Sequence, residues 1–326
     1  MTERFEGLRI KGLAAVLPRE KRHVTDFIER FGEETVARFR TAVGVESFRV
    51  AAPGQTTADL ASEAAEALKT AGRFVPEETD VILFITQTPD AVAPATSALL
   101  QKRLGLSESV FALDINQGCS GFLCGLLTAA HFLLQPTIRN VLILGGDTLS
   151  RLIDPNDHGS AMLFGDTGFA AVIGRNSAAA PWTVASATAS SEAIVIPHGG
   201  TFRMAGTEVF NFTITRVPEQ IADLMKTCGD TADSLDLLLL HQANAFIVRQ
   251  VARMLRIPAN KVPLRMTDRG NTSGATLPLL LCDLAAEGTR GAKEVILSAF
   301  GVGLTWVSCR MRLDFDAILP TVESER

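Results

Sequence analysis

The chain has 326 residues, which is long for one small core and fits two domains or two fused halves. Hydrophobic residues make up 47% of it and charged residues 21%, an ordinary globular composition, and the net charge of -5 disfavours nucleic acid as a bulk partner. Five cysteines without a Cys-x-x-Cys pair argue against a disulfide framework and a zinc site. The charged N-terminus has no apolar signal-like core, and the longest apolar run is too short to span a membrane. We therefore expect a reduced, cytoplasmic protein without a metal or a membrane segment.

Strand-like and helix-like runs alternate along the whole chain, which is typical of an α/β fold. Apolar runs of strand length predict buried strands at 80–88, 110–115, 140–147, 235–242 and 294–301. Longer runs with helical character predict helices at 95–106, 121–134, 245–257 and 275–288. No segment rich in Pro, Gly or Ser separates these elements, so we expect their halves to pack tightly.

The order of elements after Asp80 repeats after Asp236 with similar spacing. In each copy a strand and a helix are followed by a short polar segment, DINQGCSG at 114–121 or DRGNTSG at 268–274, which opens another helix. Such a repeat predicts a duplicated α/β unit with halves at 1–178 and 179–326, although any two α/β units share some likeness. It also predicts that the helix starts near Cys119 and Thr272 converge on one site.

Cys119 is the first candidate for chemistry, because it lies where an apolar strand meets an apolar helix. Unpaired N–H groups and the helix dipole at such a junction lower the pKa of a thiol and favour the thiolate. The alternative is a buried structural cysteine, the commoner fate of this residue. Cys124, Cys282 and Cys309 lie inside apolar runs and are interpreted as core, and Cys228 as the end of a helix.

Two further polar residues are candidate partners of the thiol. His241 directly follows four leucines, at the carboxyl end of a predicted buried strand, where α/β folds gather their active sites. Asn271 lies between Gly270 and Thr272 at the second helix start. A satisfied core histidine and a turn-forming asparagine remain the alternatives.

Four motifs together resemble the β-ketoacyl-acyl carrier protein synthase III group of the thiolase superfamily. They are GCSGF at 118–122, HQAN at 241–244, GNTSGA at 270–275 and AFGVGLTW at 299–306. FGDTGFAAV at 164–172 and MAGTEVF at 204–210 match connecting segments of the family. The resemblance covers nearly the whole chain and implies an α/β, thiolase-like five-layered αβαβα fold made of two duplicated halves, usually as a homodimer.

The resemblance also implies a Cys-His-Asn triad, carried here by Cys119, His241 and Asn271. Cys119 takes an acyl group from a thioester, a malonyl thioester loses carbon dioxide, and the resulting enolate attacks the acyl-enzyme to give a β-ketoacyl thioester. His241 and Asn271 donate hydrogen bonds to the thioester oxygen, where negative charge develops.

Other positions in the motifs receive supporting roles by the same resemblance. The backbone N–H groups of Cys119 and Gly303 form the oxyanion hole for acyl transfer. Gln242, Asn244 and Phe300 are assigned to substrate binding. Cofactors are not expected, since the substrates are acyl thioesters of coenzyme A or acyl carrier protein.

The sequence departs from the family pattern around the substrate. Arg38 and His158 stand where coenzyme A-using members carry a tryptophan and an arginine that sandwich the adenine, and the chain's only tryptophans, Trp182 and Trp306, lie elsewhere. We expect the acyl donor to arrive on a carrier protein or to bind coenzyme A differently. Ala93 replaces a bulky pocket phenylalanine of some relatives, which predicts a longer or branched acyl chain.

An acidic carrier protein needs a basic docking surface. Arg249, Arg253 and Arg256 recur at helical spacing after His241 and predict such a surface on one helix face, with an ordinary solvated face as the alternative.

Three other functions remain open. A cysteine hydrolase also uses Cys, His and Asn, but the local signature is missing. A non-catalytic partner subunit of a condensing enzyme usually lacks the cysteine. An acyltransferase to an alcohol or amine is disfavoured by Asn271, which points to decarboxylation, but it is the strongest alternative.

Overall fold

Two β-sheets organise the chain, and the computed structural model describes all of residues 1–326. The six-stranded sheet has the order β15 (Val322–Glu323), β2 (Leu8–Leu17), β8 (Thr167–Arg175), β7 (Asn140–Asp147), β5 (Val81–Ile85), β6 (Phe111–Ile115). The five-stranded sheet has the order β1 (Thr2–Phe5), β9 (Trp182–Thr188), β14 (Thr305–Asp314), β13 (Ala292–Gly301), β12 (Leu237–Leu240). In each sheet, parallel pairs of buried strands adjoin antiparallel ones.

The two halves exchange their terminal strands. β1 at the N-terminus pairs with β9 in the sheet of the second half, and β15 at the C-terminus pairs with β2 in the sheet of the first half. The predicted boundary at 178/179 falls between β8 and β9. The division into 1–178 and 179–326 stays a prediction. The two exchanged strands, β1 and β15, link the halves, because each pairs with the sheet of the other half.

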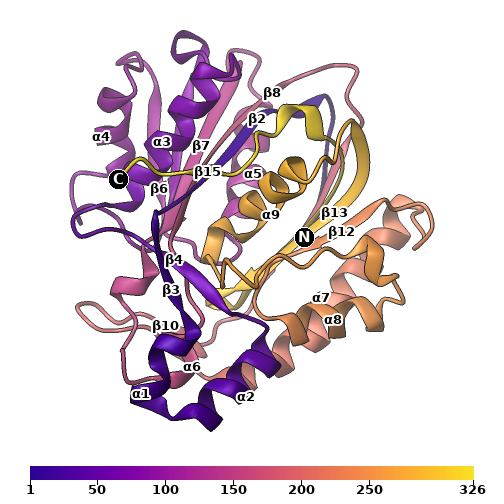
Figure 1. Cartoon of the computed structure of the whole chain (residues 1–326). Helices are drawn as coiled ribbons and strands as arrows, with labels where there is room; N and C mark the ends of the chain where they lie inside the picture. The colour runs from indigo at the N-terminus through magenta and orange to yellow at the C-terminus, as the bar shows by residue number, and fades with distance from the viewer.

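Helices cover both outer faces and fill the space between the sheets (Figure 1). Those on the six-stranded sheet are α3 (Thr57–Thr70) and α4 (Thr96–Arg103), and those on the five-stranded sheet are α7 (Gly206–Cys228) and α8 (Ala245–Met254). Between the sheets lie α5 (Gly121–Phe132) and α9 (Thr276–Ala286). This arrangement confirms the predicted five-layered αβαβα fold.

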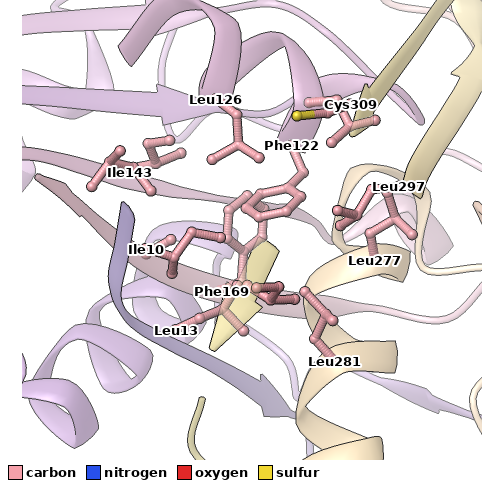
Figure 2. Packing of buried hydrophobic residues seen from close by; sticks show 14 of the residues in the cluster. Ile10, Leu13, Phe122, Leu126, Ile143, Phe169, Leu277, Leu281, Leu297 and Cys309 are labelled. Atoms are coloured by element: carbon pink, nitrogen blue, oxygen red, sulfur yellow. The ribbon is translucent and has the colours of Figure 1, made fainter. Parts of the chain in front are cut away.

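The central layer forms the largest hydrophobic cluster, to which both sheets contribute (Figure 2). Phe122 of α5 packs edge-to-face on Phe169 of β8, with ring centroids 5.5 Å apart. Burying a side chain of this size contributes roughly 2–3 kcal/mol. Gly125 lets α5 approach the sheet closely, because a Cβ there would lie 2.3 Å from Cδ1 of Ile85. Close packing of α5 on the sheet fixes where the preceding residues, including Cys119, come to lie.

A smaller cluster caps one end of the molecule beside the polar loops (Figure 1). The elements at this end of the molecule are β3 (Glu20–His23), α1 (Ile28–Phe31), α2 (Glu33–Val43), β4 (Ser47–Val50), α6 (His158–Ala161), β10 (Ile194–Val195) and β11 (Arg203–Met204). Short 3-10 turns occur at Val24–Phe27, Pro76–Glu78, Leu149–Arg151, Ala259–Lys261, Ser273–Ala275, Val302–Leu304 and Phe315–Ala317. None of the helices in the chain is both long and apolar enough to cross a membrane.

The elements expected from the sequence are confirmed except for the environment of one strand. The run at 110–115 forms β6, but this strand is not buried as predicted. It is the last strand of its sheet, and Phe111 and Leu113 are 52% and 37% exposed. An apolar run alone does not reveal that no neighbouring strand follows it, so a sheet edge was mistaken for a sheet centre.

Candidate active site

Cys119 lies between β6 and α5, one residue before the N-cap Ser120. The surrounding glycines bring backbone against it. A Cβ on Gly301, at the end of β13, would lie 2.6 Å from Cβ and 2.9 Å from Sγ of Cys119. A Cβ on Gly118 would lie 2.5 Å from Oε1 of Gln87. A side chain at Gly118 would displace the flexible Gln87 amide, whereas one at Gly301 would collide with Cys119 itself. The thiol is therefore packed against the end of the opposite sheet.

The acidity of the Cys119 thiol is opposite to the sequence expectation. Burial, followed by the charge of Asp147, raises its pKa to about 12, and the nearby Ser273 hydroxyl and Val302 backbone N–H only partly oppose this. The predicted lowering is wrong, because enclosing the sulfur costs the thiolate more solvation than the helix start returns. At neutral pH the resting side chain of Cys119 is therefore a thiol.

His241 follows β12 directly and is buried beneath the site. Its Nδ1 lies 2.6 Å from Oγ1 of Thr276, the first residue of α9, and its ring packs edge-to-face on Phe300 at 5.4 Å between centroids. Burial lowers the pKa of His241 to about 3, so the ring is neutral. When Thr276 donates to Nδ1, the ring proton lies on Nε2, where it can be donated to a ligand.

Asn271 is buried and is fixed by its own backbone. Its N–H donates to the Leu163 carbonyl at 2.9 Å, and its carbonyl accepts from the Gly165 N–H at 3.1 Å. The side-chain Oδ1 accepts the N–H of Ser273 at 2.9 Å. Because the carboxamide oxygen is engaged, the Nδ2 hydrogens are the group left to donate to a ligand.

The two helix starts adjoin, as the internal repeat predicts. A Cβ on Gly274 would lie 2.8 Å from the Gly118 carbonyl, so the turn Ser273–Ala275 touches the segment that holds the thiol. Through this turn the three predicted residues belong to one constellation. Ser273 contacts Cys119 and is bonded to Asn271, and Thr276 just beyond the turn holds His241.

A cavity of about 1060 Å³ opens beside Cys119. Its wall next to the thiol includes Gln117, Val302 and Gly303. It extends to the loop 87–92 and the segment 194–201. The predicted role of the Gly303 N–H in an oxyanion hole stays a prediction; Gly303 lines this cavity.

The residues assigned to substrate binding lie in different surroundings. Gln242 is buried, donates through Nε2 to the Leu240 carbonyl at 2.7 Å and accepts the Arg265 N–H at 2.9 Å, so both ends of its amide hold backbone. Asn244 caps α8 by accepting the Ile247 N–H at 2.7 Å. Phe300 is buried against His241. These contacts support positioning roles for all three residues.

The other three substrate positions lie at the surface. Arg38 is exposed on α2 and pairs with Glu34 one turn earlier, and His158 is exposed at the start of α6. Ala93 is exposed on the loop after β5, next to Val92, which is 92% exposed and lines the rim of the cavity. Their predicted contacts with the substrate stay predictions.

The arginines predicted for docking lie on the far side of His241, at α8. Arg249 and Arg253 are exposed and line a second cavity of about 820 Å³, together with Arg265. Arg256 lies beyond the end of α8, with a φ of 55°, so the prediction that all three share a helix face is wrong for this residue. The helix ends at Met254, before the third repeat of the pattern.

Sequence reasoning missed four residues that surround the thiol: Gln87, Asp147, Ser273 and Val302. Asp147 ends the apolar run 140–147 at the carboxyl edge of the sheet, where α/β folds gather their active sites. This position is the feature of the sequence from which Asp147 could have been predicted. Gln87 lies against the motif residue Gly118, and Ser273 and Val302 lie inside motifs. Only the folded chain brings these three residues near Cys119.

A duplicated five-layered fold with a cysteine at the start of its central helix is that of the thiolase-like condensing enzymes. The family model described as 3-oxoacyl-[acyl-carrier-protein (ACP)] synthase III matches residues 113–192, and the model of its C-terminal part matches residues 225–313. The chain belongs to the β-ketoacyl-acyl carrier protein synthase III family.

Individual relatives agree over nearly the full length. The chain is 36% identical to β-ketoacyl-[acyl-carrier-protein] synthase III 2 of Streptomyces coelicolor, over 93% of this chain and 92% of that protein. It is 33% identical to β-ketoacyl-[acyl-carrier-protein] synthase III of Caldanaerobacter subterraneus subsp. tengcongensis, over 92% and 96%. The crystal structure of a 3-oxoacyl-(acyl-carrier protein) synthase from Burkholderia xenovorans superposes with a TM-score of 0.95 at 30% identity, covering 99% of both chains.

Proposed function

We propose that this chain condenses an acyl group, held as a thioester on Cys119, with the enolate of a decarboxylating malonyl thioester. The observation that carries the proposal is the joining of Cys119, Asn271 and His241 through the 271–276 segment at two adjoining helix starts. Membership of the condensing-enzyme family and the cavity beside the thiol support it.

The first half-reaction is acyl transfer. Sγ of Cys119 attacks the thioester carbon, the carbonyl oxygen becomes an oxyanion, and the donor leaves as a thiolate that takes up a proton. Backbone N–H groups of Cys119 and Gly303 stabilise the oxyanion, because fixed dipoles in an enclosed site need no reorganisation. The product is an acyl-enzyme with the acyl chain in the adjacent cavity.

The second half-reaction is decarboxylation and carbon–carbon bond formation. As the malonyl carboxylate leaves as carbon dioxide, negative charge moves to the thioester oxygen. Nε2–H of His241 and Nδ2–H of Asn271 donate to that oxygen. The enolate carbon attacks the acyl-enzyme carbonyl, the bond between that carbon and Sγ of Cys119 breaks, and the Cys119 thiolate leaves and takes up a proton. A neutral histidine suits this role. Burial keeps the pKa of the His241 ring at about 3, so the ring does not take up a second proton during the reaction.

Two features of the protein surface support the choice of acyl donor. Arg38 pairs with Glu34, and its position offers no aromatic ring to stack on adenine. Arg249 and Arg253 form no ion pair in the structure and border a cavity with an apolar floor. An acidic acyl carrier protein docked on these cations is the donor we propose.

The assembly is proposed to be a homodimer through β6. This edge strand presents unpaired backbone groups together with the exposed side chains of Phe111 and Leu113. Pairing of two such edges about a twofold axis buries both side chains and continues the six-stranded sheet across the subunits.

Product analysis tests the proposed reaction. The protein is incubated with acyl-carrier thioesters and malonyl-carrier protein labelled at the free carboxyl group. A β-ketoacyl product with stoichiometric loss of labelled carbon dioxide is expected. Acyl transfer to an added alcohol or amine without use of malonyl thioester would contradict it and favour the acyltransferase.

A further inference from the structure

Asp147 is a buried carboxylate without a counter-ion, 1% exposed at the end of β7. No ion pair reaches it. Its Oδ1 accepts the Gln87 N–H at 2.7 Å, the Thr86 hydroxyl at 3.0 Å and the Thr88 hydroxyl at 3.5 Å, while no hydrogen bond of standard geometry engages Oδ2. A buried charge held in this way is costly, which calls for a reason beyond packing.

Asp166 shows how the same fold treats a purely structural carboxylate. It is equally buried, but both of its oxygens are occupied. Oδ1 accepts the Ser150 N–H at 3.0 Å, and Oδ2 accepts the Ala51 N–H at 2.8 Å and the Ser150 hydroxyl at 2.6 Å. Asp147 differs by its free oxygen and by its place beside the nucleophile.

Ser273 connects Asp147 to Cys119. The hydroxyl is buried, forms no hydrogen bond of standard geometry in the resting structure, and lies close enough to both groups to lower the pKa of each. Its backbone has a φ of 51°, unusual for a residue with a side chain, and the Asn271 side chain holds it there by accepting its N–H. A strained residue with an uncommitted hydroxyl between a thiol and a carboxylate is a functional arrangement.

We propose that Asp147 is the proton acceptor of Cys119, reached through the hydroxyl of Ser273. The S–H bond breaks, its electron pair stays on sulfur, the proton passes to Oγ of Ser273, and the Ser273 proton passes to Oδ2 of Asp147. The outcome is a thiolate beside a neutral carboxylic acid, so the buried site keeps its total charge. When the donor thiolate leaves, the proton returns by the same path. This proposal rests on Cys119 being the acylated residue.

The relay explains how an enclosed thiol reacts near neutral pH. His241 is a poor acceptor, because its pKa is about 3. Burial, with a smaller contribution from the nearby Asp166 charge, raises the pKa of Asp147 to about 6. The carboxylate is therefore ionised and able to accept a proton above that pH. Its protonation also removes the repulsion that opposes the thiolate.

Alkylation of Cys119 by iodoacetamide, followed from pH 5 to 10 by peptide mass mapping, tests the relay. We expect the wild-type rate to rise through about pH 6 and then to level off, as Asp147 becomes available. Asp147→Asn keeps an oxygen for the three Oδ1 bonds but accepts no proton. Ser273→Ala breaks the path, and Ser273→Gly, which suits a positive φ, serves if the alanine variant does not fold. Each variant is expected to lose the step at pH 6 and about 100-fold in alkylation rate.

Ser97→Ala is the matched control, because Ser97 is also buried with an unpartnered hydroxyl but is the second residue of α4. It is expected to keep the wild-type profile. Faster alkylation of Asp147→Asn than wild type at neutral pH would overturn the proposal, since Asp147 would then only repel the thiolate. Retention of the pH 6 step in Asp147→Asn, or in the Ser273 variant that folds, would overturn the proposal as well. Failure of the proposed function differs from both: wild-type protein would form no acyl-enzyme at Cys119 with any thioester.

Discussion

The helices α5 and α9 begin at corresponding places in the two halves, but the residues before them are organised differently. A full strand, β6, leads to Cys119 and α5. Before α9 there is only the isolated bridge between Phe164 and Asn271, followed by a 3-10 turn. The first arrangement fixes the thiol of Cys119. The second brings Ser273 to that thiol and ties Ser273 to Asn271, while Thr276 holds His241. The duplicated scaffold therefore carries different groups at its two helix starts.

Removing the carboxamide of Asn271, at the second helix start, tests this difference between the two helix starts most severely. Asn271→Ala is expected to lower the rate of malonyl decarboxylation by about 10²–10³-fold, the usual loss of one oxyanion donor. Acylation of Cys119 is expected to fall less than decarboxylation, because its oxyanion is held by backbone and Ser273 loses only the hydrogen bond that its N–H donates to Asn271. Radiolabelled carbon dioxide release and intact mass measure the two steps separately.

Thr272→Val is the control for that variant, since it removes a buried, unpartnered hydroxyl from the same segment. It should retain both activities. Equal losses of acylation and decarboxylation in Asn271→Ala would contradict separate roles for the two helix starts.

Two of the edge strands, β12 and β6, offer a second contrast. β12 is covered, with three of its four residues buried, whereas β6 exposes apolar side chains. Phe111→Lys with Leu113→Lys is expected to weaken self-association by about 30-fold or more, because charges would enter the buried centre of the interface. Sedimentation velocity over a concentration series measures this. Val75→Lys, at another exposed apolar residue, should leave association unchanged; an equal effect there would remove β6 from the interface.

The two basic residues on α8 test where the carrier protein binds. Arg249→Glu with Arg253→Glu is expected to raise KM for carrier-bound substrates about tenfold, because docking charges change sign. Acylation by a small synthetic thioester should be unaffected. Lys69→Glu reverses an exposed charge on α3 and serves as control. The same rise in KM for both variants would point to net charge rather than to a docking surface.

The smallest expected effect concerns the charge of His241. Its pKa is lowered to about 3, so the ring stays neutral at every pH above that value. The rate of malonyl decarboxylation is therefore expected to change less than about twofold between pH 6 and 8. The acyl-enzyme is formed beforehand, so that the titration of Asp147 during acylation does not contribute. A rise or fall with an inflection near pH 6.5, the ordinary histidine pKa, would then show that the His241 ring titrates.

Sequence patterns predicted the parts that depend on local order. Apolar runs gave the strands and helices, the repeat gave the adjoining helix starts, and the motifs gave Cys119, His241 and Asn271. The rest depends on contacts between distant residues. The burial that raises the pKa of Cys119 comes from both halves, Asp147 and Ser273 are separated by most of the second half, and the exposure of β6 depends on sheet order. None of these leaves a local pattern.

The central claim is that Cys119 carries the acyl group, and intact mass spectrometry tests it most directly. The protein and its Cys119→Ala variant are incubated with a panel of acyl-coenzyme A and acyl-carrier thioesters. The account predicts a mass gain equal to one acyl group in the wild type, strongest with carrier thioesters, and no gain in the variant. A gain that persists in Cys119→Ala, or product formation from a donor that leaves no acyl group on the wild type, would contradict it.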